Sequence, residues 1–165
     1  MQTVFCKTQE ETQRLGESLG ACLREGDAVL LRGEMGAGKS VLTRAAAKAM
    51  GVEGPVPSPT FTILNIHDGR KMKLYHFDLY RLSDVDELYG MGLDEMIPPA
   101  DGACMIEWPE QAEEAMPEDA LTIHAEYAED SMARLFTLTP GGAFDQARID
   151  EIMQYMEEHH EHSDD

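Results

Sequence analysis

The 165-residue chain is poor in basic residues and in cysteine. Its 13 Lys and Arg residues stand against 32 Asp and Glu residues, which gives a formal net charge of -19. A field of this sign repels phosphate backbones, so we expect no unaided binding to nucleic acid; the acidic surface suits simple solubility or a basic protein partner. The three cysteines, Cys6, Cys22 and Cys104, form no CxxC pair and lie in or beside apolar stretches. They are therefore predicted to be core thiols in a reducing compartment.

Long apolar runs are also missing. No run of about 18 apolar residues occurs, which predicts no membrane span. The first residues, MQTVFCKTQEET, lack the basic and apolar regions of a signal peptide, so a cytoplasmic location is expected. No repeat or low-complexity linker interrupts the chain, and its length suits one domain. We expect an ATPase domain in residues 1–140. Residues 141–165 are predicted to form an amphipathic helix, from the spacing of Ile149, Ile152, Met153 and Met156, and an acidic tail that contains histidines.

Helical and strand patterns alternate early in the chain, and hairpin patterns follow. Helices are expected at residues 8–24, where Thr8 and Glu11 form a capping-box pattern, then after a glycine-rich loop up to Gly51, and as short pieces at 83–89 and 94–97. Strands are expected at 27–33, 61–67, 71–79 and 103–107, with edge strands at 121–127 and 134–139. Asp68-Gly69 predicts a hairpin. This order predicts an α/β protein with a three-layer, P-loop NTPase-like fold and a mixed parallel and antiparallel sheet.

The glycine-rich loop carries a phosphate-binding motif. Gly33-Glu-Met-Gly-Ala-Gly-Lys-Ser40 matches G-x-x-x-x-G-K-[ST] between a predicted strand and a predicted helix, which is the context that this motif needs. Glycines let backbone N–H groups wrap around phosphate oxygens at a helix N-terminus. Lys39 would bridge the outer phosphates, and Ser40 would offer its hydroxyl to Mg²⁺. The motif therefore predicts a site for ATP and Mg²⁺.

Two acids at the ends of predicted strands could complete a hydrolytic site. Asp78 ends KLYHFD and Glu107 ends ACMIE, and each could also be an ordinary solvated acid. Because Glu107 follows the more apolar run, we expect it to be the direct metal ligand and Asp78 to act through water.

Thr60 and Trp108 have two interpretations each. Thr60 follows a proline-rich loop and could face the γ-phosphate as a switch threonine, or could be a simple turn residue. Trp108, the only tryptophan, could be buried, or could have a gating or partner-facing role. The histidines near the C-terminus, His159, His160 and His162, are expected to belong to a solvated tail.

The ordered blocks of the chain resemble the TsaE family. These blocks are LRGEMGAGKS, VPSPTFTILN, LYHFDLYRL, ELYGMGLDE and MIEWPE. The resemblance implies that Gly36, Ala37, Gly38, Lys39, Ser40 and Val41 bind phosphate. It also implies that Ser40 and Glu107 bind Mg²⁺, that Asp78, Thr60 and Trp108 are functional, and that Thr8 and Gln9 approach the nucleotide base. Members of the family usually have threonine where this chain has Val41, so only the backbone N–H could contact phosphate there.

The same resemblance implies a cellular role. It indicates an ATPase that supports threonylcarbamoyladenosine modification of tRNA by resetting a complex of TsaD-like and TsaB-like proteins, and that meets tRNA only through that complex. A small-molecule P-loop kinase is the first alternative, although the arginines are scattered and form no lid-like cluster. An ATP-sensing module without turnover is the second alternative.

Overall fold

The computed structural model describes residues 1–128 and 132–159. Residues 160–165 of the predicted tail, with His160 and His162, lie outside this part of the chain. The strands are β1 (Gln2–Cys6), β2 (Ala28–Gly33), β3 (Leu64–Asp68), β4 (Lys73–Asp78), β5 (Gly102–Glu107), β6 (Leu121–Tyr127) and β7 (Arg134–Thr139). The α-helices are α1 (Gln9–Cys22), α2 (Lys39–Ala49), α3 (Val85–Gly90) and α4 (Gln146–Glu158), and two short 3-10 segments are η1 (Leu93–Met96) and η2 (Pro109–Ala115).

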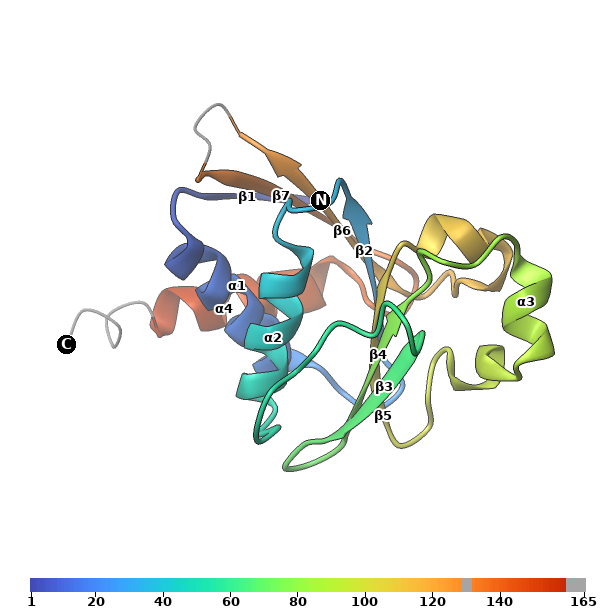
Figure 1. Ribbon diagram of the computed structural model, residues 1–165. Helices are drawn as coiled ribbons and strands as arrows, with labels where there is room; N and C mark the ends of the chain where they lie inside the picture. Colours follow the sequence, from blue (N-terminus) through green and yellow to red (C-terminus); the bar gives the residue numbers. More distant parts are fainter. Residues whose placement is uncertain (129–131, 160–165) are drawn as a thin grey trace.

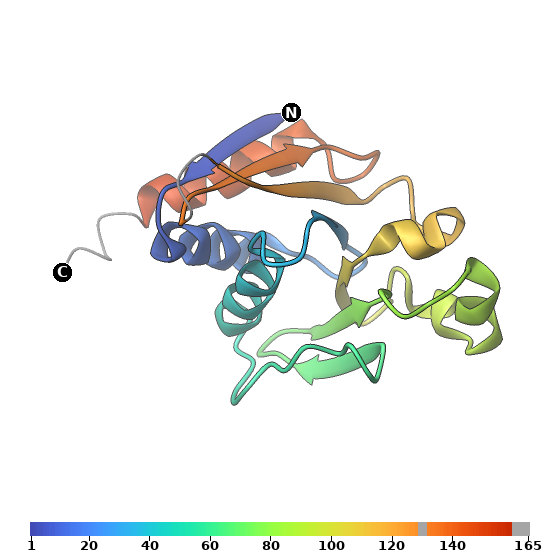
Figure 2. The same cartoon turned by 45° about the horizontal axis from the view of Figure 1, so that its top comes forward.

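All seven strands form one mixed sheet in the order β1-β7-β6-β2-β5-β4-β3. The central strands are parallel, because β2 pairs with both β5 and β6, and β5 pairs with β4, in the same direction. The outer pairs, β3 with β4, β6 with β7 and β7 with β1, are antiparallel. In Figure 2 the sheet runs from β1 at the top to β3 at the bottom. The predicted mixed sheet is confirmed.

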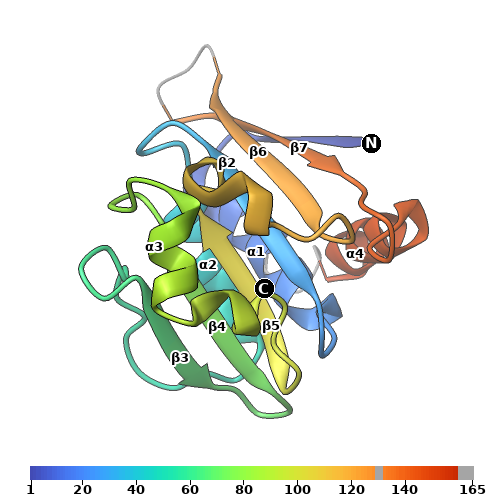
Figure 3. The ribbon, with the colours of Figure 1, turned by 90° about the vertical axis from the view of Figure 1, so that its right-hand side faces the viewer.

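Helices cover both faces of the sheet. Successive strand residues point to opposite faces, so Val29 and Leu31 of β2 pack into one core and Leu30 packs into the other. The first core lies under α1, α2 and α4, and the second lies under α3 and the 3-10 segments. Figures 1 and 3 show α1 and α2 on one side of the sheet and α3 on the other. The three-layer prediction is confirmed.

The prediction that residues 121–127 and 134–139 form edge strands is wrong. β6 lies between β2 and β7, and β7 lies between β6 and β1, so both are paired on two sides. The edges are β1 and β3. The physical reason is the pairing of the first strand with the last, from Gln2 opposite Leu138 to Cys6 opposite Arg134, which covers β7. No strand was predicted at residues 2–6.

The hairpin between β3 and β4 forms, but its strands are shorter than predicted. β3 begins at Leu64 because Ile63 adopts a φ of 69° and donates a backbone hydrogen bond to Pro59, which makes a turn of the preceding residues. Asp68 pairs with Lys73, and Gly69 N–H donates to the Met72 carbonyl, so the connection is a four-residue turn.

The three cysteines are free and buried. Burial raises the pKa of Cys104 to about 12, and the pKa values of Cys6 and Cys22 to about 11. The interpretation as core thiols is confirmed. Among the described residues, no helix is long and apolar enough to cross a membrane.

A largely buried ion pair joins helix α4 to the residue just before β2. The helix lies beside α1 (Figure 1), and Ile149 and Ile152 contribute to the core. The Arg148 guanidinium donates two hydrogen bonds to Asp27, at 3.0 and 2.6 Å, and a third to the Cys22 carbonyl at 3.1 Å. The hydrogen bond to Asp27 raises the pKa of Arg148, so the guanidinium keeps its charge.

Replacement of Arg148 by alanine should lower the free energy of unfolding by about 2 to 4 kcal/mol, because the largely buried Asp27 carboxylate loses its ionic partner. Arg24 is the matched control. Its pair with Glu151 is exposed, so Arg24→Ala should cost less than about 1 kcal/mol. Urea denaturation of both variants measures the difference. Equal losses would contradict the assigned importance of the Arg148–Asp27 pair.

Candidate nucleotide-binding site

The phosphate-binding motif forms the loop between β2 and α2. Gly33, Gly36 and Gly38 have φ angles of 134°, 80° and 109°, in the region that glycine adopts most readily. A Cβ atom on Gly33 would lie 2.2 Å from the Ala125 carbonyl oxygen, and one on Gly36 would lie 2.5 Å from the Tyr127 hydroxyl. The backbone conformation therefore favours glycine at all three positions, and at Gly33 the neighbouring backbone also leaves no space for a side chain.

Strands β6 and β7 hold this loop from outside. The Tyr127 hydroxyl donates a hydrogen bond to the Met35 carbonyl at 2.7 Å, and the Arg134 guanidinium donates to the Gly36 carbonyl at 3.3 and 3.4 Å. Arg134 also lies over the Tyr127 ring, 4.4 Å from its centroid. The two loop carbonyls are thus directed toward β6 and β7, which support the loop in this conformation.

One cavity of about 250 Å³ brings most of the predicted site residues together. It is lined by Met35, Gly36, Gly38, Lys39, Ser40, Val41, Ser58, Thr60, Asp78, Glu107 and Trp108. It lies at the carboxyl ends of β2, β4 and β5, which is where ligands bind in parallel α/β sheets. Of the other predicted residues, Gly33 ends β2 and Ala37 is buried in the core.

The two acids lie side by side in the sheet. Asp78 and Glu107 are register partners at the ends of the parallel strands β4 and β5, and each is 5% exposed. A Glu107 carboxylate oxygen, Oε1, accepts a weak hydrogen bond from the Ser40 hydroxyl at 3.5 Å. The other oxygen, Oε2, lies 2.8 Å from Nε2 of His76. Glu107 is therefore the acid nearer to the phosphate-binding loop.

Asp78 has a separate set of partners. Its Oδ2 accepts a hydrogen bond from the Thr60 hydroxyl at 3.0 Å and a longer one from Ser58 at 3.5 Å, while Oδ1 accepts from the Tyr80 backbone N–H at 3.0 Å. The Ser58 and Thr60 hydroxyls are 2.9 Å apart. Asp78 thus ties the proline-rich loop to the end of β4.

Lys39 is folded against its own loop and Trp108. Its side chain is buried, its Nζ donates a hydrogen bond to the Gly33 carbonyl at 2.6 Å, and the same nitrogen lies 3.8 Å from the centroid of the Trp108 ring. Burial lowers the pKa of Lys39, and the negative charges of Glu107, Glu110 and Asp78 oppose that change. Trp108 has a φ of 58° and contacts the Tyr80 ring at 5.0 Å, so it covers the lysine at the edge of the cavity.

The residues expected near the nucleotide base lie beside the cavity. Gln9 and Val41 line a neighbouring groove between α1 and α2, of about 170 Å³. The Thr8 hydroxyl instead accepts a hydrogen bond from the Glu11 N–H at 3.2 Å and caps α1. The structure therefore brings Gln9 toward the end of the loop and assigns Thr8 a capping contact.

Sequence reasoning missed two residues of this site, Ser58 and His76. Ser58 lies two residues before Thr60, and His76 lies two residues before Asp78 on β4. Because side chains two residues apart in a strand point to the same face, the position of Asp78 could have indicated His76.

The residues of the cavity fit a Mg²⁺–nucleotide complex better than a metal bound by protein alone. Within residues 1–128 and 132–159, no three His, Cys, Asp or Glu side chains form a group that could hold a metal ion. Mg²⁺ in phosphate-transfer sites is commonly held by one or two carboxylates together with phosphate oxygens and waters. Ser40 beside Glu107, next to a loop with three positive-φ glycines, is a donor set of that kind.

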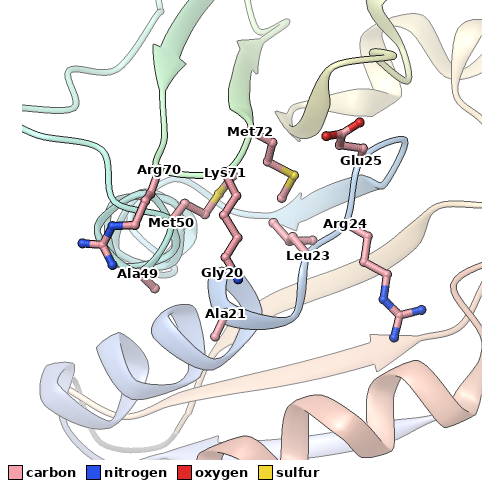
Figure 4. A pocket seen from close by; sticks show the side chains of 10 residues that line it. All are labelled: Gly20, Ala21, Leu23, Arg24, Glu25, Ala49, Met50, Arg70, Lys71 and Met72. Carbon is pink, nitrogen blue, oxygen red and sulfur yellow. The ribbon is translucent and has the colours of Figure 1, made fainter.

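A larger cavity, of about 430 Å³, lies at the other end of α2 (Figure 4). It is formed by the carboxyl ends of α1 and α2 and by the turn between β3 and β4. The 11 residues of α2 separate it from the phosphate-binding loop by about 16 Å. Its charged residues, Arg24, Glu25, Arg70 and Lys71, are exposed, so no buried polar groups converge there. The smaller cavity is the better candidate site.

Comparisons with known proteins agree on one family. The family model described as threonylcarbamoyl adenosine biosynthesis protein TsaE matches residues 6–136. The tRNA threonylcarbamoyladenosine biosynthesis protein TsaE of Bacillus subtilis is 37% identical over 133 residues, which are 81% of this chain and 82% of the relative. The protein of the same name from Treponema pallidum is 36% identical over 117 residues, or 71% of this chain and 85% of the relative. A crystal structure of Bacillus subtilis YdiB superposes with a TM-score of 0.76 at 29% identity, over 93% of this chain and 95% of that one.

Proposed function

Because the chain belongs to the TsaE family of threonylcarbamoyl adenosine biosynthesis proteins, we propose that it is a Mg²⁺-dependent ATPase that supports threonylcarbamoyladenosine modification of tRNA. The observation that carries this proposal is the single cavity in which Lys39, Ser40 and the two acids, Asp78 and Glu107, meet under the phosphate-binding loop. A nucleotide site needs the loop and the lysine, and hydrolysis also needs acids at strand ends.

The charges of the cavity support a requirement for a divalent metal ion in this proposal. Its lining includes one cation, Lys39, and two carboxylates, Asp78 and Glu107. The phosphates of ATP would be repelled by these carboxylates unless a divalent cation accompanied them. Ser40 and Glu107 would hold that Mg²⁺, which supplies charge neutralisation on the phosphates when the terminal bond breaks.

The other side chains have distinct tasks in this proposal. Lys39 would leave the Gly33 carbonyl and the Trp108 ring to contact the outer phosphates. Trp108 would gate access of the nucleotide to the cavity, and its surroundings would change when the nucleotide binds. Asp78 would orient water beside the metal, and Thr60, held by Asp78, would face the γ-phosphate. Gln9 and the Val41 backbone would lie toward the rest of the nucleotide.

Among the described residues, those that line the cavity include no arginine that could stabilise the charge of the transition state. Such an arginine, when supplied by a partner, raises hydrolysis by about 10³- to 10⁵-fold in other P-loop enzymes. We therefore propose that the isolated chain is a weak ATPase and that TsaD-like and TsaB-like proteins activate it, with hydrolysis resetting their complex between turnovers.

Phosphate release by the purified protein tests the proposal. Weak, Mg²⁺-dependent release that rises when TsaD-like and TsaB-like proteins are added is the expected result. Phosphorylation of an added metabolite would support a kinase instead. Tight ATP binding without release, alone or with partners, would indicate a sensing module.

The isolated protein should not bind tRNA at physiological salt. Its net charge of -19 provides no phosphate neutralisation and no release of counterions from the RNA. Gel-shift titration with tRNA, first without and then with the partner proteins, is the measurement. A salt-sensitive, micromolar shift with this chain alone would contradict the prediction that it meets tRNA only through the complex.

A further inference from the structure

We propose that His76 is a positioning residue that fixes the Glu107 carboxylate for Mg²⁺, an inference that rests on the proposed function. His76 lies in β4, where its register partner in β5 is Met105, two residues before Glu107. The imidazole is 2% exposed, and its Nε2 lies 2.8 Å from Oε2 of Glu107. A buried histidine thus contacts the carboxylate assigned to the metal.

The two oxygens of the Glu107 carboxylate face different partners. Oε2 faces His76, and Oε1 faces the Ser40 hydroxyl at 3.5 Å. An ionised carboxylate only accepts hydrogen bonds, so Nε2 of His76 must carry the hydrogen. His76 therefore leaves Oε1, the oxygen beside the phosphate-binding loop, available to a metal.

The remaining surroundings of the ring point to the same role. Its other nitrogen, Nδ1, is buried and has no hydrogen-bond partner among the described residues. The Glu107 carboxylate is thus the polar group to which the His76 ring is tied. An apolar side chain would fill the same space in β4, but it would leave Glu107 free to turn.

The partners of the two acids are separate. Asp78 is held by Thr60, Ser58 and the Tyr80 N–H, and none of these bonds involves His76. Loss of His76 should therefore act on the metal ligand and spare the acid that orients water. Partners that orient metal ligands typically change metal affinity by about 10- to 100-fold.

The test is a titration of the full chain with Mg²⁺ in the presence of mant-ADP. The fluorescence of mant-ADP reports its binding. His76→Leu should raise the Mg²⁺ concentration that gives half of the fluorescence change by about 10- to 100-fold. Its affinity for mant-ADP measured in EDTA, which removes Mg²⁺, should stay within about 3-fold of the parent value. In His76→Gln the Mg²⁺ concentration that gives half of the fluorescence change should lie within about 3-fold of the parent value. The reason is that the glutamine side chain can still donate a hydrogen bond from its amide to Glu107. His124→Leu is the control, since His124 is an exposed histidine on β6, in the same sheet, and does not line the cavity.

Two further variants keep the inference testable. If His76→Leu does not fold, His76→Asn replaces it: this amide is polar but too short to reach Glu107, so it should show the same Mg²⁺ defect. In a Glu107→Gln background, His76→Leu should cause no additional loss of Mg²⁺ dependence. Parent-like Mg²⁺ dependence in the Leu and Asn variants, or a Gln variant as defective as Leu, would overturn the inference. Absence of any Mg²⁺ effect in the parent would overturn the proposed metal site itself, which is a separate outcome.

Discussion

Replacement of Lys39 by alanine is expected to lower ATP hydrolysis by about 100- to 1,000-fold, because the variant loses the cation that lines the cavity in the described part of the chain and that would contact the transferred phosphate. Single-turnover phosphate release at saturating ATP is the measurement. Lys71→Ala is the control, since Lys71 is exposed and lies in the turn between β3 and β4, beside the larger cavity at the other end of α2. It should keep parent activity within about 2-fold.

Lys39→Arg should be nearly as inactive, although it keeps the charge. The Lys39 side chain is only 4% exposed and fits between the Gly33 carbonyl and the Trp108 ring. A planar guanidinium is larger and presents its donors in a fixed fork, so it cannot replace a compact ammonium there.

Normal phosphate release by folded Lys39→Ala protein would remove the basis of the nucleotide-site assignment.

Alanine variants of the two acids should differ in kind. Glu107→Ala should weaken Mg²⁺-dependent nucleotide binding by about 10- to 100-fold and lower hydrolysis as well, because Glu107 lies beside Ser40. Asp78→Ala should lower hydrolysis by about 100-fold and change nucleotide affinity by less than about 3-fold, because its partners are Thr60 and Ser58.

Mg²⁺ titration against a fluorescent ATP analogue, combined with single-turnover hydrolysis, separates the two variants. A larger loss of Mg²⁺ affinity in Asp78→Ala would reverse the assignment of the acids. Full activity in both variants would mean that neither acid takes part in hydrolysis.

Features coded by contiguous residues were predictable. The motif from Gly33 to Ser40 depends on local backbone chemistry, and the structure has a loop of positive-φ glycines between β2 and α2 there. Asp78 and Glu107 could be selected because each ends an apolar run, and parallel pairing of those runs places strand ends at one edge of a sheet.

Features that depend on pairing between distant segments were not predictable. Residues 2–6 are short and half exposed, and nothing near them in the sequence indicates that they pair with β7. β7 is internal for that reason, whereas β6 is internal because it pairs with β2 as well as with β7. His76 was missed because its partner, Glu107, belongs to another strand, and only the register of β4 against β5 brings the two together.

The pairing of β1 with β7 sets an order for assembly during synthesis. β1 leaves the ribosome well before its partner strand, which is formed by residues 134–139. At about 5 to 20 residues per second, roughly 7 to 27 s pass between the emergence of Gln2 and that of Leu138. Through that interval β1 is an unpaired strand with Val4, Phe5 and Cys6 uncovered. A nascent chain halted before β7 would expose β1 to chaperones and to other unpaired strands. In the completed chain, one edge of β1 is hydrogen-bonded to β7.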